Sequence, residues 1–172
     1  MPSWVGKEGH LLATPRVVIG VVTVSDTRTL ADDASGPALV AALQALGYEN
    51  FERRVVRDEI PEIQGALRAL VPLCAAVFTT GGTGFSLRDV TPEATAPLLE
   101  RRADSLSELI RLRGLDHTPY SHLSRGVAGI IGRTLVVNLP GSPKGARQGI
   151  EALAPLLTPI LTSLGGEDCP VP

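Results

Sequence analysis

The sequence predicts an α/β protein with three layers: a doubly wound, mainly parallel sheet with an antiparallel edge, covered by helices on both faces. Short segments rich in β-branched residues alternate with segments whose apolar residues recur at helical spacing, and this alternation occurs at least three times. The 172 residues, 44% of them apolar, suffice for one such domain. We expect a flexible arm over residues 1–15, a single domain over 16–164 and a frayed tail over 165–172.

The first half of the chain carries three strand signals and two helix signals in alternation. Arg16–Val24 is an almost unbroken β-branched segment, typical of a strand buried on both faces. Helical spacing follows over Ala34–Leu46. A second strand is expected over Phe51–Val56, then a helix that Pro61 opens. Ala75–Thr80 predicts the third strand, so the order is that of repeated βα units.

The second half continues the pattern with different connections. Thr91, followed by proline and an acid, predicts a helix start, and Ala103–Leu115 reads as a further amphipathic helix. Residues 127–131 and 134–138 flank Gly132-Arg133 and predict a hairpin that adds the antiparallel edge. A last helix should begin at Ser142-Pro143, run towards Leu164, and be kinked or divided by Pro155 and Pro159.

Composition excludes several functional classes. The net charge of −2 removes the broad basic surface expected of a nucleic-acid or acidic-membrane binder, but permits a local anion pocket. Cys74 and Cys169 form no CxxC pair or metal-ligand cluster, and Cys74 reads as a small core residue. No apolar segment is long enough to span a bilayer, and the N-terminus lacks signal-peptide features. We therefore expect a soluble cytoplasmic protein.

Three loops at the carboxyl ends of predicted strands are candidates for chemistry, because ligands of such sheets bind there. Thr79–Gly84 contains three glycines, which allow backbone amides to approach a phosphate; the alternative is a tight turn. It has neither the lysine of a P-loop nor GxGxxG spacing. Asn138–Lys144 combines a helix start with one of only two lysines, although Ser142 there could serve as a plain N-cap. Ser25–Arg28 follows the central strand.

Two aspartates lie where they could assist phosphate chemistry. Asp89 directly precedes a helix start and lies close in sequence to the glycines, while Asp58 ends the second strand. A carboxylate beside a phosphate is repelled unless a divalent cation bridges them, so Asp89 indicates Mg²⁺ binding or a general base. The alternatives are local hydrogen bonding for Asp89 and a solvated loop acid for Asp58.

The ordered motifs resemble the Mog/MoaB family of molybdenum-cofactor biosynthesis, which includes the plant Cnx1 G domain and the gephyrin G domain. In chain order they are TVSDTR, DDASGP, VRDEIPEI, TTGGTG, RDVTPEA, HLSRGVAG and NLPGSPKG. The most specific is TTGGTG followed closely by RDVTPEA. The resemblance covers roughly residues 17–161 and implies a molybdopterin-binding fold and the reaction of ATP with molybdopterin, with Mg²⁺, to give adenylyl-molybdopterin and pyrophosphate.

The resemblance also implies which residues act. Asp58 and Asp89 match acidic positions that affect catalysis, as Mg²⁺ ligands or substrate-orienting groups. Substrate-binding positions are implied at Ser25, Asp26, Thr80, Gly81, Gly82, Thr83, Gly84, Ser124, Arg125, Gly141, Ser142 and Pro143.

The resemblance leaves the branch and the assembly open. Phe85-Ser86-Leu87 departs from the bacterial adenylyltransferase pattern and is closer to the MoaB-like branch. The alternatives are therefore a MoaB-like protein that binds molybdopterin without adenylyltransferase activity, and a stand-alone relative of MoeA or CinA domains. The family further implies a homo-oligomer, a trimer or a hexamer, and possible contacts with other enzymes of the pathway.

Overall fold

The computed structural model describes residues 16–166, and within that range the chain forms a six-stranded sheet flanked by helices. The strands are β1 (Val18–Val24), β2 (Asn50–Val56), β3 (Ala76–Thr80), β4 (Arg101–Arg102), β5 (Ala128–Ile131) and β6 (Thr134–Leu139). The helices are α1 (Ser35–Ala45), α2 (Ile60–Leu70), α3 (Thr91–Thr95), α4 (Asp104–Gly114) and α5 (Pro143–Gly165), with 3₁₀ turns at Ala96–Leu98 and Pro119–Leu123.

The strand order β2-β1-β3-β6-β5-β4 places the two most apolar early strands at the centre. β2, β1, β3 and β6 are parallel, and β5 and β4 add an antiparallel edge. After β1 the chain returns to one side of that strand as β2, and after α2 it crosses to the other side as β3. The connections from β1 and β3 therefore diverge, which is the topological switch point where open α/β sheets bind ligands.

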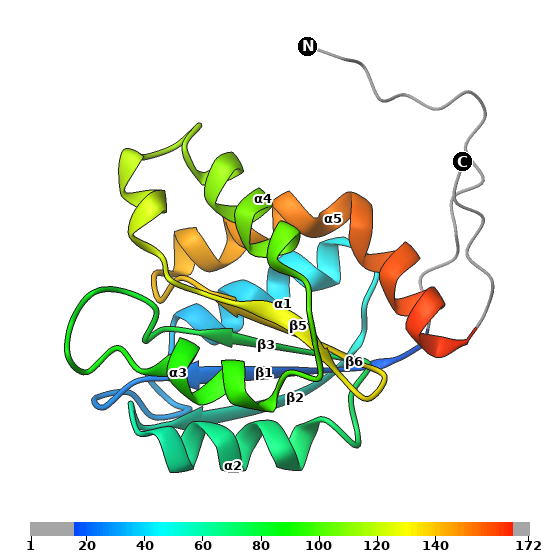
Figure 1. Ribbon diagram of the computed structural model, residues 1–172, viewed down its shortest axis with the longest axis horizontal. Coiled ribbons are helices and arrows are strands. Elements are labelled where there is room, and N and C mark those ends of the chain that lie inside the picture. The colour runs from blue at the N-terminus through cyan, green and yellow to red at the C-terminus, as the bar shows by residue number, and fades with distance from the viewer. Residues whose placement is uncertain (1–15, 167–172) are drawn as a thin grey trace.

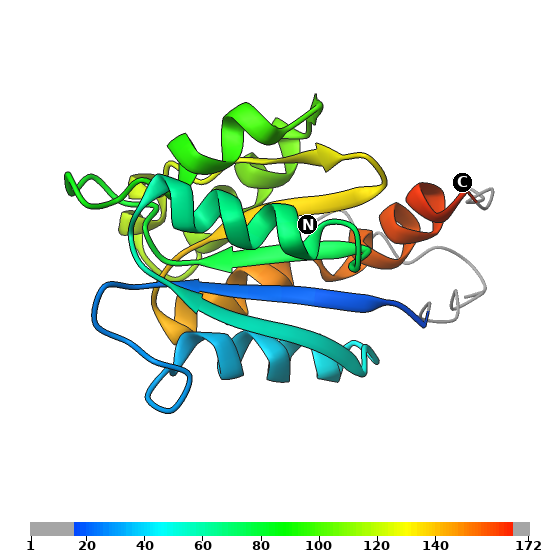
Figure 2. The ribbon, with the colours of Figure 1, turned by 90° about the horizontal axis from the view of Figure 1, so that it is seen from below.

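The sheet separates two apolar cores, as the three layers in Figure 1 show. One core packs β1, β3 and β6 side chains such as Phe78 and Leu139 against α1, α4 and α5. The other packs Val22, Val77 and Val136 against α2 and α3. Consecutive residues of one strand thus serve opposite cores, which explains the unbroken β-branched segments. Seen from below, α2 lies across the sheet face that it covers (Figure 2).

The fold class and the predicted βα units are confirmed, and three details differ. The hairpin supplies only one antiparallel strand, because β6 lies inside the sheet and runs parallel to β3. Arg101–Arg102 forms the short β4, which two exposed arginines did not signal. α5 continues through Pro155 and Pro159 without division, since buried Leu153, Leu157 and Leu161 anchor it on both sides of each proline.

Some sequence expectations concern residues beyond the described range. The arm over residues 1–15, most of the tail and Cys169 lie outside residues 16–166. Cys74 is buried among the residues that pack against α2, and this burial raises the pKa of its thiol to about 11. That environment confirms Cys74 as a core residue. In the part of the chain that the structure describes, no helix has the length and apolarity to cross a membrane.

Candidate functional site

The glycine loop after β3 lies where the ends of three parallel strands meet. A Cβ on Gly81 would lie 2.3 Å from the carbonyl oxygen of Val24, and one on Gly141 would lie 3.0 Å from the Gly81 Cα. Gly81 has a φ of 103°, a conformation that side chains disfavour. The Thr80 hydroxyl donates to the Pro140 carbonyl at 2.6 Å. Thr80 and Gly81 thus hold the strand ends together.

The next two glycines face carboxylates. A Cβ on Gly82 would lie 3.0 Å from Asp58 Oδ1, and a Cβ on Gly84 would lie 2.9 Å from Asp89 Oδ2. Thr91 also fixes the loop, because its hydroxyl donates to the Gly81 carbonyl at 2.9 Å and its amide donates to the Gly82 carbonyl at 3.0 Å. The loop therefore presents bare backbone beside two acidic groups.

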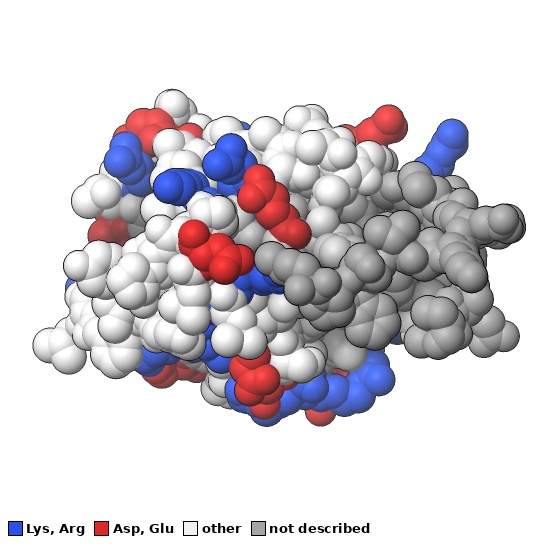
Figure 3. Space-filling model, turned by 90° about the horizontal axis from the view of Figure 1, so that it is seen from above, with Lys and Arg blue, Asp and Glu red and all other residues white. Residues whose placement is uncertain are grey.

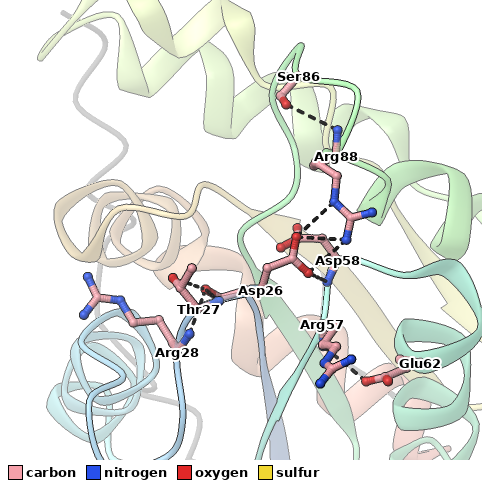
Figure 4. A network of polar contacts seen from close by, with 9 residues as sticks. Asp26, Thr27, Arg28, Arg57, Asp58, Glu62, Ser86 and Arg88 are labelled. Atoms are coloured by element: carbon pink, nitrogen blue, oxygen red, sulfur yellow. Dashed lines mark hydrogen bonds and ion pairs between the residues drawn. The ribbon is translucent and has the colours of Figure 1, made fainter.

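A polar network joins the loops after β1, β2 and β3 (Figure 4). Arg88 donates to Asp26 through Nε at 2.9 Å and through a terminal nitrogen at 3.0 Å, and the Asp58 amide donates to Asp26 at 3.1 Å. Hydrogen bonding from Arg88 lowers the pKa of Asp26. The pKa of Asp58 is raised, first by burial and then by the negative charges of Asp26 and Asp89.

A cavity of about 500 Å³, which we call the glycine-lined cavity, opens beside this network. Of the residues implied by the resemblance it collects Gly82, Thr83, Gly84, Asp89, Ser124, Gly141 and Ser142. Lys144, which the sequence also singled out, lines the cavity as well, but sequence reasoning did not assign other polar lining residues such as His117, Tyr120 and Gln148. The residues around His117 and Tyr120 form a polar connection without a chemical motif, and Gln148 lies inside a helix, so no pattern marked them.

Ser142 has a structural role at the mouth of the same cavity. Its hydroxyl accepts the Gly145 amide at 3.0 Å and so caps α5, while Pro143 occupies the first turn of the helix and does not line the cavity. Lys144 lines it next to the cap. The N-terminus of a long helix and a lysine make this end of the cavity favourable for an anion.

The remaining predicted residues lie outside the glycine-lined cavity. Ser25 and Asp26 line a separate hollow of about 810 Å³, to which Arg28, Arg54 and Arg57 also contribute. The Ser25 hydroxyl accepts the amides of Thr27 and Arg28 in a local turn. Asp58 lies between the two hollows, next to Gly82 on one side and Asp26 on the other.

Arg125 contacts protein groups and is not among the residues that line either hollow. Its guanidinium donates to the Gly84 and Asp89 carbonyls and pairs with Glu93.

On the face above α4 and α5, charged side chains of both signs are interspersed, with no broad field of one sign (Figure 3). Positive charge near the site is thus local.

Two carboxylates of the site, those of Asp58 and Asp89, are the candidate ligands for a metal ion. Among residues 16–166, no group of three or more His, Cys, Asp or Glu side chains is arranged to hold a metal ion. Asp58 and Asp89 each lie beside the glycine loop, and Arg88 already neutralises Asp26. Two carboxylates match Mg²⁺ sites in which substrate phosphates complete the coordination.

Comparisons with known proteins agree on one family. The profile described as "Probable molybdopterin binding domain" matches residues 20–159. A molybdopterin adenylyltransferase of Helicobacter pylori is 38% identical over 81% of this chain and 82% of its own. MoaB of Thermus thermophilus, a molybdopterin biosynthesis enzyme, superposes with a TM-score of 0.81 at 42% identity and covers 89% of this chain and 99% of its own.

A longer relative shows the same region within a larger protein. The molybdenum cofactor synthesis protein cinnamon of Drosophila melanogaster is 40% identical over 88% of this chain. The match spans only 26% of the fly protein.

Proposed function

The chain belongs to the MoaB/Mog family of molybdopterin-binding proteins of molybdenum-cofactor biosynthesis, and on this premise we propose that it is a molybdopterin adenylyltransferase. The reaction transfers AMP from ATP to molybdopterin. An oxygen of the terminal phosphate of molybdopterin attacks the α-phosphorus of ATP, the bond from that phosphorus to the bridging oxygen breaks, and pyrophosphate leaves.

The observation that carries this proposal is the pairing of bare backbone with carboxylates. A Cβ on Gly82 would meet the Thr91 hydroxyl at 2.3 Å and Asp58 Oδ1 at 3.0 Å, and one on Gly84 would meet Asp89 Oδ2 at 2.9 Å, so neither position has room for a side chain. Glycine amides can approach phosphate oxygens closely, and a phosphoryl transfer depends mainly on positioning and charge stabilisation. Lys144 and the α5 N-terminus supply positive potential across the glycine-lined cavity. The site therefore has the groups needed to orient two phosphorylated substrates.

We include Mg²⁺ in the proposal, with Asp58 and Asp89 as its protein ligands. The raised pKa of Asp58 reflects burial and the accumulation of negative charge from Asp26 and Asp89, an arrangement that a cation would stabilise. When bound, Mg²⁺ supplies charge neutralisation for phosphate oxygens. Independently of the metal, Asp89 organises its own loop by accepting the Ser86 amide at 2.9 Å.

The test is a defined assay with purified protein, molybdopterin, ATP and Mg²⁺ that follows adenylyl-molybdopterin and pyrophosphate. We expect both products in equal amounts, and their loss when Mg²⁺ is chelated. Tight molybdopterin binding by calorimetry without product would instead identify a MoaB-like binding protein. The exposed Phe85 and Leu87, where the sequence departs from the bacterial adenylyltransferases, make that outcome the relevant alternative.

The proposal extends to assembly and location. We propose a homo-oligomer, a trimer or a hexamer, in the cytoplasm, with small molecules as substrates. Light scattering during size-exclusion chromatography gives the mass of the assembly, and a monomer at micromolar concentration would overturn the oligomeric part alone.

A further inference from the structure

We infer that Arg125 is a positioning residue that fixes the loop carrying Asp89, rather than a group that binds substrate. Arg125 follows the 3₁₀ turn Pro119–Leu123, far in sequence from the loop it contacts. The expected effect of Arg125 on turnover rests on the proposed function. Its effect on the loop rests only on the contacts described below.

Both ends of the loop are attached to this one residue. The Arg125 Nε donates to the Gly84 carbonyl at 2.7 Å, and a terminal nitrogen donates to the Asp89 carbonyl at 2.7 Å. The Arg125 amide donates to the Thr83 carbonyl at 2.8 Å. A guanidinium presents its donors in a rigid fork, so these contacts fix the separation of the two loop ends.

The other edge of the guanidinium is also occupied. It forms an ion pair with Glu93 in α3, and this pairing lowers the pKa of the Glu93 carboxyl. Glu93 holds the guanidinium in place from the helix that follows the loop. With two carbonyls and a carboxylate as partners, Arg125 has little donor capacity left for a phosphate.

Between these attachment points the loop is also tied to the rest of the protein by the ion pair of Arg88 with Asp26, while its tip is exposed. Leu87 is 99% exposed, and Phe85 is also exposed. Inside the loop, the Ser86 amide donates to the Asp89 carboxylate at 2.9 Å, and the Asp89 amide donates to the Ser86 carbonyl at 3.0 Å. That small turn sets the direction of the Asp89 carboxylate within the loop, whereas Arg125 sets where the turn lies relative to Gly84.

The experiment compares Arg125→Ala and Arg125→Lys with wild type in steady-state turnover and in amide hydrogen exchange of residues 84–89. We expect kcat to fall about 100-fold in both variants, because a displacement near 1 Å at a reacting group costs that much. The KM for molybdopterin should stay within about threefold, since no substrate contact is lost. The loop amides should exchange faster.

Two further variants separate positioning from general structure. Glu93→Gln removes the charged partner but keeps both carbonyl contacts, so its loss of kcat should be smaller than that of Arg125→Ala. Arg102→Ala removes a comparable bidentate arginine pair, with Asp104, that lies away from the loop. This control should leave kcat and exchange in the loop unchanged.

Chemical rescue gives a readout that a purely structural defect would not show. Guanidinium chloride at a concentration too low to denature the protein should restore part of the kcat of Arg125→Ala, whereas equal sodium chloride should not. If Arg125→Ala does not fold, Arg125→Lys and Glu93→Gln carry the test.

The outcomes distinguish the two proposals. A raised KM for molybdopterin with kcat preserved would make Arg125 a substrate-binding residue and overturn the inference. Wild-type exchange at residues 84–89 in folded Arg125→Lys would also overturn it. If wild-type protein has no turnover, the adenylyltransferase proposal fails, while the exchange measurement still decides the role of Arg125.

Discussion

Two aspartates in the connection between β1 and α1 have opposite surroundings. The side chain of Asp33 is 1% exposed and that of Asp26 is 36% exposed, and each pairs with one arginine. Asp33 accepts hydrogen bonds from the Thr23 hydroxyl at 2.8 Å, the Gly36 amide at 3.0 Å and Arg53 at 2.9 Å. Asp33 is a buried acid that belongs to the fold.

Asp26 is instead part of the site. It contacts Arg88 and the Asp58 amide, both from loops at the carboxyl ends of strands, and its surroundings stay open. The difference shows that a short acidic motif does not reveal its role. The role follows from whether the carboxylate faces the helix start of its own connection or the crevice between strand ends.

The largest expected effect concerns a site acid without a fold role. Under the proposed function, Asp89→Asn should reduce turnover about 1,000-fold, because it removes a charged ligand of the Mg²⁺ that would neutralise the reacting phosphates. The asparagine oxygen can still accept the Ser86 amide, so the melting temperature should stay near that of wild type. Turnover and differential scanning calorimetry on the same preparation check both parts. A lowered melting temperature with full specific activity would place Asp89 with Asp33 as a fold residue.

Asp33→Asn should show the reverse pattern. It removes the buried partner of Arg53 and weakens several hydrogen bonds, so we expect a loss of about 3 kcal/mol in the free energy of unfolding. Turnover per folded molecule should not change. A urea titration monitored by circular dichroism measures the free energy of unfolding. Turnover normalised by active-site titration measures the activity per folded molecule. Glu52→Gln, on the same strand as Arg53 and with an exposed side chain, is a matched control.

The pH dependence of stability sharpens the same contrast. Burial raises the pKa of Asp33, but hydrogen bonds from Gly36, Thr23 and Arg53 outweigh it and leave the pKa lowered. The stabilisation is therefore complete above the unfolded value of about 3.9 and is lost as the pH falls below it through the lowered folded value. Urea midpoints measured from pH 6 downwards should decline in wild type more steeply than in Asp33→Asn. Parallel curves would contradict the assignment.

Ser142→Ala tests a residue that belongs to both categories. Loss of the cap on α5 should cost about 1 kcal/mol of stability. Ser142 also lines the glycine-lined cavity. We propose that molybdopterin occupies this end of the cavity, so molybdopterin binding should weaken more than ATP binding. Calorimetry with each ligand checks this, and Ser142→Asp, which keeps a cap, should retain stability while repelling an anionic ligand. Equal weakening for both ligands would remove Ser142 from the molybdopterin side of the cavity.

Much of this arrangement could be predicted from the sequence because it follows from local patterns. Alternating strand and helix signals placed β1, β2 and β3, and the rule that ligands bind at strand ends then selected the loops at Ser25, Gly82 and Ser142. Local roles within those loops could also be predicted, such as the N-cap that Ser142 forms on α5, whereas long-range roles could not. Arg125 contacts Gly84 and Asp89, 41 and 36 positions earlier in the chain, and such contacts leave no periodicity in the sequence.

The smallest expected effect on stability concerns Asp26, the exposed member of the compared pair. Asp26→Asn breaks its ion pair with Arg88, and because exposed pairs contribute little, the urea midpoint should move less than in Asp33→Asn or Ser142→Ala. The pKa of Asp58, however, is raised in part by the Asp26 charge and should fall when that charge is removed. Carboxyl carbon chemical shifts measured against pH in metal-free protein follow Asp58 directly. An unchanged Asp58 titration would mean that the charge of Asp26 does not contribute to the raised pKa of Asp58, and that Asp26 and Asp58 do not share one electrostatic site.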